Sequence, residues 1–233
     1  MNMRHFAIIA GGFWLAAMGQ AIAQSKPVVV VELYTSQGCS SCPPADEFMA
    51  TLVANPDVIA LALHVDYWDY IGWKDEFANA AFTDRQKDYA RAIGSRTIYT
   101  PQMIVNGIDR VEGNNPEAVE SLVRMHLMEN SGVSLMLQRD GNRLIVRGSG
   151  DMARPLTVNL VRYVPNETVT IERGENAGLT MDYHNIVTEF TTIGEWSGET
   201  PLAMEAVISG ADPVVVFLQA QGPGAILAAA RLD

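Results

Sequence analysis

The sequence predicts an α/β domain followed by a mostly antiparallel, sandwich-like β domain. Three observations lead to this prediction. Continuous apolar runs alternate with helical periodicity up to residue 131, helical periodicity is lost after Ser131, and hairpin signals such as Asp140-Gly141-Asn142 then separate apolar strands. We therefore expect the domains at residues 24–131 and 132–233.

The first domain is expected to begin with two buried strands, because residues 28–34 and 58–65 are continuously apolar or β-branched. Proline is favoured in the first turn of a helix, so Pro43-Pro44 predicts a helix start after the first strand. The predicted order is strand, helix, strand, helix, strand, strand, helix. The later elements are a helical region at about 75–94, strands at 102–105 and 108–112, and a helix from 115 to about 130.

The second domain is expected to contain β-strands and no helix. Its hairpin signals include Gly222-Pro223-Gly224 as well as the turn near residue 141. The expected strands are residues 135–139, 143–147, 156–164, 168–173, 179–192, 214–220 and 225–232.

Residues 1–23 have the pattern of a secretory signal peptide. A short basic start at Arg4 and His5 precedes an apolar run over residues 6–18, and Ala21-Ile22-Ala23 matches a cleavage site. The alternative is an uncleaved membrane anchor, but the apolar run is shorter than the roughly 20 residues that span a bilayer. We expect a periplasmic or secreted protein that is not embedded in a membrane after cleavage.

The chain carries 16 Lys and Arg against 27 Asp and Glu residues, for a net charge of −11. A field of this sign repels polyanions. We therefore expect no nucleic-acid partner.

The 2 cysteines of the chain are Cys39 and Cys42. A structural disulfide gains most chain-entropy stabilisation by closing a long loop, whereas this pair closes almost none. A reactive role therefore explains the cysteine pair better than stabilisation of the fold does, and we expect thiol–disulfide exchange.

The cysteines are expected at a strand-to-helix junction, at the N-terminus of the helix. Positive partial charge there lowers a cysteine pKa. We assign Cys39 as the exposed nucleophile and Cys42 as the half-buried resolving residue. Because Ser40-Ser41 adds no positive charge and acidic residues follow, we expect a less oxidising pair than the strongest oxidants that use such a motif.

Two other uses of the cysteines stay open. Both thiolates together could hold copper(I), helped by Met49 or His64. The pair could instead form a passive disulfide in a non-catalytic binding module. A zinc site is disfavoured, because zinc needs four ligands and there is no second cysteine pair.

The segment Thr100-Pro101-Gln102-Met103-Ile104-Val105-Asn106-Gly107 resembles the Thr-Val-Pro-x-x-x-Asn-Gly region of glutaredoxins, in the thioredoxin superfamily. The resemblance implies a thioredoxin-like first domain in which Pro101 is cis and faces the cysteines, with Thr100 pairing with the substrate. The later Glu112-Gly113-Asn114 differs from the Gly-Gly-Asp that helps many glutaredoxins hold glutathione.

The segments 35–46, 64–69 and 172–176 together resemble a family of secreted bacterial thioredoxin-like proteins of unknown function. This resemblance covers nearly the whole chain after residue 23. It implies the fold and the exported setting, and it names no substrate.

Tyr67, Trp68 and Trp73 are candidates for substrate binding. They follow the carboxyl end of a predicted strand, as Cys39 does, and ligands of open α/β sheets bind at that edge. An aromatic platform beside the cysteines is the functional interpretation. The alternative is a hydrophobic cluster that seats the helical region after residue 75.

Glu32 is a further candidate, because thioredoxins keep a buried acid beneath the resolving cysteine as a proton acceptor. A carboxyl group in a buried strand has a raised pKa and can accept a proton. The alternative for Glu32 is an ion pair with a lysine or arginine. The charged run 172–176 is expected to be a loop that contacts the first domain or a partner, or else a solvated turn.

The sequence therefore predicts an exported thiol–disulfide oxidoreductase without a bound cofactor. Its expected partners are proteins or small thiols that carry disulfides or thiols. A reductase would also need an electron donor, commonly a membrane protein.

Overall fold

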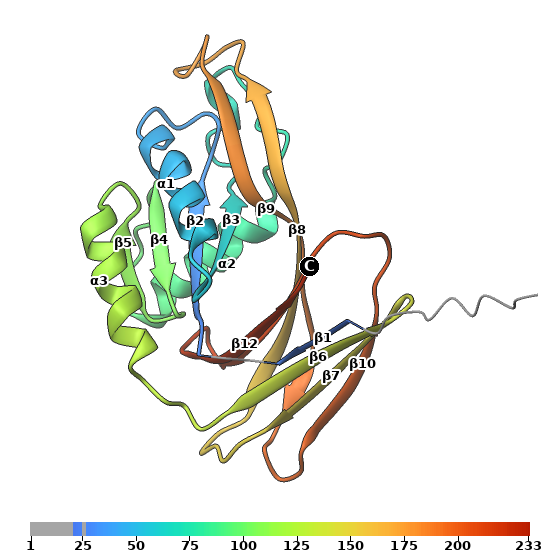
Figure 1. The fold of residues 1–233 in the computed structure, drawn as a ribbon. Coiled ribbons are helices and arrows are strands. Elements are labelled where there is room, and N and C mark those ends of the chain that lie inside the picture. The colour runs from blue at the N-terminus through green and yellow to red at the C-terminus, as the bar shows by residue number, and fades with distance from the viewer. Residues whose placement is uncertain (1–20, 25–26) are drawn as a thin grey trace, which may run out of the picture.

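The computed structural model describes residues 21–24 and 27–233 (Figure 1). The predicted signal peptide lies outside the described residues up to residue 20, and its cleavage motif falls in β1 (Ala21–Gln24). In the described part of the chain, no helix is long and apolar enough to cross a membrane.

Between residues 29 and 127, called the first half below, the elements follow the order that the sequence predicts, with a short 3-10 helix added after the second strand. The helices are α1 (Pro43–Ala54), η1 (Asp69–Ile71), α2 (Ala80–Ala92) and α3 (Pro116–Leu127). The remaining strands are β2 (Val29–Thr35), β3 (Val58–His64), β4 (Gln102–Val105), β5 (Asp109–Glu112), β6 (Ser134–Asp140), β7 (Arg143–Ser149), β8 (Leu156–Thr170), β9 (Thr180–Trp196), β10 (Leu202–Val207), β11 (Val214–Ala220) and β12 (Ile226–Leu232).

The strands form a large sheet of 8 strands, in the order β12-β11-β8-β9-β3-β2-β4-β5, and a small sheet of 4, in the order β1-β6-β7-β10. In the large sheet β2 is parallel to β3 and antiparallel to β4, and β4 is antiparallel to β5. The large sheet continues across the predicted domain boundary at residue 131, because β9 pairs with β3 through Ile186 and Ala62.

The first half buries both faces of β2, as expected of a strand with parallel pairing. Val29, Val31 and Leu33 pack with α1 and α3, whereas Val30 and Tyr34 pack with α2 on the other face. The sheet therefore has α1 and α3 on one side and α2 on the other (Figure 1).

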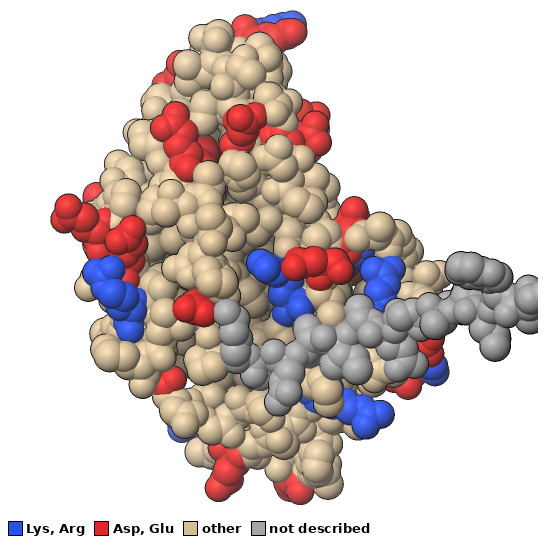
Figure 2. Space-filling view, in the orientation of Figure 1, with Lys and Arg blue, Asp and Glu red and all other residues tan. Residues whose placement is uncertain are grey.

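In the second half the strands pair antiparallel with one another, and the two sheets pack face to face. Leu135, Leu137, Leu144 and Val146 of the small sheet share one core with side chains of β8, β11 and β12. Figure 2 shows charged side chains dispersed among uncharged ones on one face of the molecule.

The hairpin of β8 and β9 belongs to both halves. Its lower part lies in the core between the two sheets, and its far end extends alongside the first half (Figure 1). At that end Ile171, Met181 and Tyr183 pack with Trp73 and Phe77 from the segment between β3 and α2. The hairpin thereby brings its tip to the end of the sheet where α1 begins.

A buried ion pair connects β2, α2 and β11. Arg85 donates to Glu32 Oε1 through Nε at 2.9 Å and through Nη2 at 2.7 Å, and Nη2 also reaches Tyr89 and Gln219. The guanidinium group lies 4.2 Å from the ring centroid of Phe190. Glu32 therefore has the arginine partner that the sequence allowed as its alternative.

The proton-acceptor role expected of Glu32 does not agree with this placement. Successive side chains of a strand point to opposite faces, and Glu32 points to the face that packs on α2, whereas the cysteines belong to α1 and its preceding loop. The carboxylate holds the sheet to α2 instead of lying beneath Cys42.

We predict that Arg85→Met destabilises the protein by about 3–5 kcal/mol, because it leaves the buried Glu32 carboxylate without its partner. The measurement is the free energy of unfolding in urea. The matched control is Lys87→Met on the same helix, which breaks an exposed pair with Asp84 and is expected to cost about 1 kcal/mol or less. Equal losses in the two variants would contradict the structural role of Arg85.

Candidate active site

The two cysteines lie at the junction of β2 and α1. A turn from Ser36 to Cys39 follows the strand, Cys42 is the N-cap residue of α1, and prolines fill the first helical positions. Cys39 and Cys42 form a disulfide with a Cα–Cα distance of 5.4 Å. The local sequence explains this arrangement, since proline has no N–H to leave unpaired in the first turn of a helix.

Both cysteines are buried in this oxidised state, which corrects the expectation that Cys39 is exposed. Cys39 is 1% exposed and Cys42 is 0% exposed. The segment after β3 closely approaches the turn before Cys39, because a Cβ on Gly38 would lie only 3.1 Å from the Cβ of Trp68. Ser40 and Ser41 between the cysteines are exposed.

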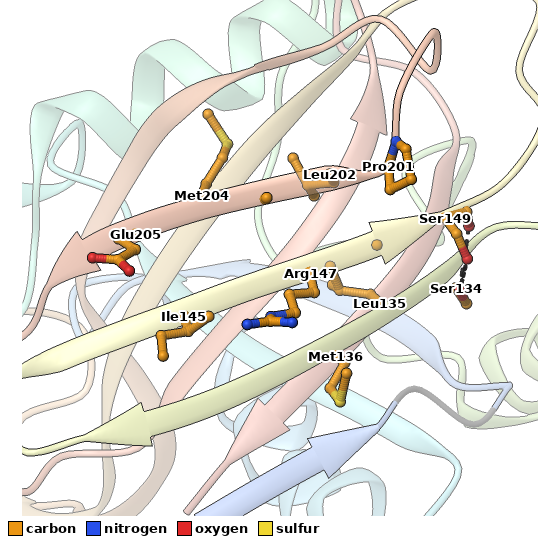
Figure 3. Close-up of a pocket in the computed structure, with 12 residues that line it drawn as sticks. Ser134, Leu135, Met136, Ile145, Arg147, Ser149, Pro201, Leu202, Met204 and Glu205 are labelled. Atoms are coloured by element: carbon orange, nitrogen blue, oxygen red, sulfur yellow. Dashed lines mark hydrogen bonds between the residues drawn. The ribbon is translucent and has the colours of Figure 1, made fainter.

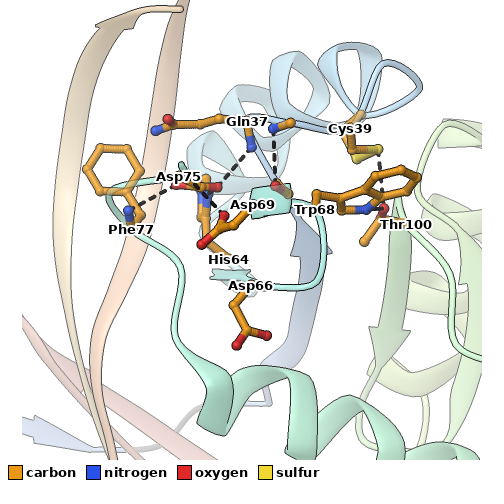
Figure 4. Close-up of polar contacts among 12 residues, drawn as sticks. Gln37, Cys39, His64, Asp66, Trp68, Asp69, Asp75, Phe77 and Thr100 are labelled. Carbon is orange, nitrogen blue, oxygen red and sulfur yellow. Dashed lines mark hydrogen bonds and ion pairs between the residues drawn. A yellow bond between two sulfur atoms is a disulfide. The ribbon is translucent and has the colours of Figure 1, made fainter. Parts of the chain in front are cut away.

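A chain of two hydrogen bonds ends on the Cys39 sulfur (Figure 4). Trp68 Nε1 donates to Thr100 Oγ1 at 2.7 Å, and Thr100 Oγ1 donates to Cys39 Sγ at 3.2 Å. The indole N–H occupies a lone pair of the hydroxyl group and leaves the hydroxyl proton for the sulfur. A hydroxyl donor at this position would stabilise a Cys39 thiolate.

Pro101 lies against the start of α1. The Thr100–Pro101 peptide bond is cis, as the resemblance to glutaredoxins implies. Gly113 allows the close packing, because a Cβ there would lie 3.0 Å from the Cβ of Pro101 and 3.1 Å from that of Ala45. The structure thus brings Thr100 and Pro101 together with the cysteines.

Asp75 is a buried residue of the site that the sequence did not identify. Its Oδ2 accepts from the backbone N–H of Gln37 at 2.8 Å and lies 2.7 Å from His64 Nδ1 (Figure 4). Burial alone lowers the pKa of His64, but the charge and hydrogen bond of Asp75 raise it, and the net shift is upward. Asp75 therefore fixes both the turn before Cys39 and a buried histidine.

The second half of the chain contributes Asn176 to the same turn. The Nδ2 group of Asn176 donates to the carbonyl oxygens of Gln37 and Cys39, both at 2.9 Å. Asn176 lies at the tip of the hairpin of β8 and β9 and is buried, whereas Glu172 and Glu175 of the same charged run are exposed. The run therefore contacts the first half through its asparagine.

The three aromatic candidates have different surroundings. Trp68 lies beside Thr100 and Cys39, and Trp73 Nε1 donates to Gln37 Oε1 at 2.7 Å while its ring packs with the hairpin tip. Tyr67 donates instead to Gln86 of α2 at 3.2 Å, and burial raises its pKa to about 12. Trp68 is the candidate that lies next to the disulfide.

The residues suggested as helpers for copper are engaged elsewhere. Met49 is buried in the core between the sheet and α1, and His64 Nδ1 pairs with Asp75. Over residues 21–24 and 27–233, no group of three or more His, Cys, Asp and Glu side chains is arranged to hold a metal ion.

A surface depression of about 540 Å³ lies in the small sheet, in a part of the molecule remote from α1 (Figures 1 and 3). Met136, Ile145, Arg147 and Glu205 are among the residues that line it. No cysteine or histidine lines this depression.

These features define an α/β protein in which a C-x-x-C disulfide is enclosed between a helix N-terminus and a long β-hairpin. The chain belongs to the family described as "Protein of unknown function (DUF1223)", whose model matches residues 30–219. Comparison with curated proteins gave no match.

Two solved structures resemble the chain. A crystal structure of an Agrobacterium tumefaciens protein is 33% identical, with a TM-score of 0.78 over 89% of this chain and 95% of that one. HBP35 of Porphyromonas gingivalis is 14% identical, with a TM-score of 0.63 over 89% of this chain and 75% of its own. The second likeness shows similarity of fold alone.

We predict that Thr100→Val raises the pKa of the reduced Cys39 thiol, because the thiolate loses a hydrogen bond, and a hydrogen bond to a charged group contributes roughly 1.5–3 kcal/mol. Thr100→Ser retains the hydroxyl group and should have a nearly unchanged pKa. The pH dependence of alkylation by iodoacetamide measures the pKa. Identical profiles for the valine and serine variants would show that the hydroxyl does not stabilise the thiolate.

Proposed function

We propose that this protein is an exported thiol–disulfide oxidoreductase whose first half is thioredoxin-like. The observation that carries the proposal is the Cys39–Cys42 disulfide at the start of α1, with the Thr100 hydroxyl group on the Cys39 sulfur and cis-Pro101 packed against the same helix. A helix N-terminus and a hydroxyl donor are two features that stabilise a thiolate.

The arrangement of the first half supports the thioredoxin-like part of the proposal. Strand β2 is parallel to β3, antiparallel β4 and β5 follow on its other side, and α1 and α3 cover the face opposite α2. The exported setting rests on the signal-peptide pattern of residues 1–23.

The chemistry needs only the two sulfurs and a substrate. In the reducing direction, the Cys39 thiolate attacks a substrate disulfide, forms a mixed disulfide and releases one substrate sulfur as a thiolate. Cys42, once deprotonated, then attacks the Cys39 sulfur, re-forms the Cys39–Cys42 bond and releases the second substrate thiolate. Two electrons pass to the substrate, and the reverse sequence oxidises a dithiol.

The buried disulfide indicates that substrate must approach by displacing part of its cover. Ser40 and Ser41 mark the exposed side of the motif, and Trp68 with Thr100 borders the Cys39 sulfur. The proposed substrates are proteins or small thiols, with a membrane electron donor as the partner if the protein works as a reductase.

We predict that the protein catalyses the reduction of insulin by dithiothreitol. Cys39→Ser removes the nucleophile and should lower the rate to the uncatalysed level. Cys42→Ser should also lose turnover, and when the reduced variant is mixed with insulin in the absence of dithiothreitol it should retain a mixed disulfide at Cys39, because no second thiol of the protein resolves it. The rate is followed by turbidity and the adduct by mass spectrometry.

If the disulfide is passive, this experiment is expected to give a different result. A wild-type disulfide that stays intact in dithiothreitol under native conditions, with no mixed disulfide in Cys42→Ser, would contradict the proposed function and favour a non-catalytic binding module.

A further inference from the structure

Four buried titratable side chains form a group near the start of α1. Asp46 comes from α1, His64 from the end of β3, Asp75 from the segment before α2, and Tyr183 from β9. Burying a charged group costs free energy unless the group is paired. The proposed exchange chemistry has one step that needs such a group, because Cys42 must lose a proton before it can attack.

Asp46 is positioned one helical turn after Cys42. The backbone N–H of Asp46 donates to the Cys42 carbonyl oxygen at 3.1 Å, so the two residues occupy positions i and i+4 of the same turn. Side chains at this spacing lie on the same face of a helix. Cys42 is fully buried and Asp46 is 3% exposed, so the thiol and the carboxyl group share the face of α1 that points into the molecule.

His64 is held in one orientation by Asp75. His64 Nδ1 lies 2.7 Å from Asp75 Oδ2, and Asp75 is itself fixed by the backbone N–H groups of Gln37 and Phe77. The imidazole ring has edge-to-face contacts with Phe77 and Tyr183, with centroids 5.2 and 5.1 Å apart. His64 Nε2 is buried and has no hydrogen-bond partner among the described residues.

The electrostatics of the group are suited to proton transfer near neutral pH. Burial raises the pKa of Asp46 to about 7, the charge of His64 acts in the opposite direction, and the charges of Asp75 and Glu47 act with burial. From β9, Tyr183 also faces the group and has a raised pKa, so it stays neutral. A carboxyl group in this range can accept a proton and return it.

We propose that Asp46 accepts the proton of Cys42 during the exchange reaction. Asp75 holds His64 in place, and the charge of His64 favours the carboxylate form of Asp46. This inference rests on the proposed function. In the resolving step the Cys42 proton moves to a carboxylate oxygen of Asp46. The electron pair left on the Cys42 sulfur forms the bond to the Cys39 sulfur, and the substrate sulfur leaves as a thiolate.

The test uses the fully reduced protein and Ellman's reagent as the disulfide probe. Cys39 attacks the reagent and releases a first thionitrobenzoate, and Cys42 releases the second when it resolves the mixed disulfide. Stopped-flow absorbance separates the two steps across a range of pH. For the wild-type protein, the second rate is expected to rise with an inflection near pH 7, where Asp46 becomes a carboxylate.

Asp46→Asn should move this inflection toward the ordinary cysteine value of about 8.5 and should slow the second step at pH 7 by about tenfold or more. The first step should keep its rate within about twofold. Glu117→Gln removes one negative charge from the first turn of α3 and is the matched control, with both steps unchanged.

His64→Gln provides a second test that does not depend on the folding of the Asp46 variant. It removes the positive charge that lowers the pKa of Asp46, so the inflection of the second step should move to higher pH. A purely structural histidine would change the rates without moving the inflection.

Two failures are distinguishable. If Asp46→Asn and His64→Gln both keep the wild-type pH profile while Cys39 and Cys42 still react, the inference about Asp46 is wrong and the proposed function stands. If the wild-type protein releases no second thionitrobenzoate at any pH, both are wrong.

Discussion

The turn that carries Cys39 depends on hydrogen bonds from outside its own segment. A buried backbone group that lacks a partner costs free energy, and this turn is buried between a helix start and a hairpin. Asp75 accepts from the Gln37 N–H, and Asn176 donates to the Gln37 and Cys39 carbonyl oxygens. The disulfide is therefore held by a segment after β3 and by the tip of a hairpin from the other half of the chain.

This constraint gives the second half of the chain a part in the site. The hairpin of β8 and β9 extends the large sheet beyond β3, packs with the small sheet at one end and reaches the cysteine turn with Asn176 at the other. The Glu32–Arg85 pair, which continues to Gln219 of β11, adds a second connection. A movement of the β half would therefore change the hydrogen bonds that hold the turn at Cys39.

Local sequence patterns predicted the features that depend on neighbouring residues. The apolar runs before and after α1 and the prolines at its start predicted the strands and the position of the cysteine pair. The cis peptide at Pro101 was implied by the resemblance of its segment to glutaredoxins. Burial of Cys39 escaped prediction because Asn176 is 137 residues away and Trp68 arrives from another loop. The partner of Glu32 was open for the same reason, since Arg85 lies 53 residues further along. The sequence pattern does not indicate which acidic residue of α1 lies near a histidine of β3. Asp46 could therefore be identified as a candidate proton acceptor only from the packing of the structure.

The proposed oxidoreductase function requires the Cys39–Cys42 pair to be a reversible couple rather than a passive crosslink. The most direct measurement is its equilibrium with glutathione redox buffers, quantified by alkylation and mass spectrometry. The account predicts complete, reversible equilibration with a potential well below the roughly −120 mV of the strongest oxidants, since the dipeptide between the cysteines carries no positive charge. A pair that never equilibrates with glutathione while the protein stays folded would contradict the account.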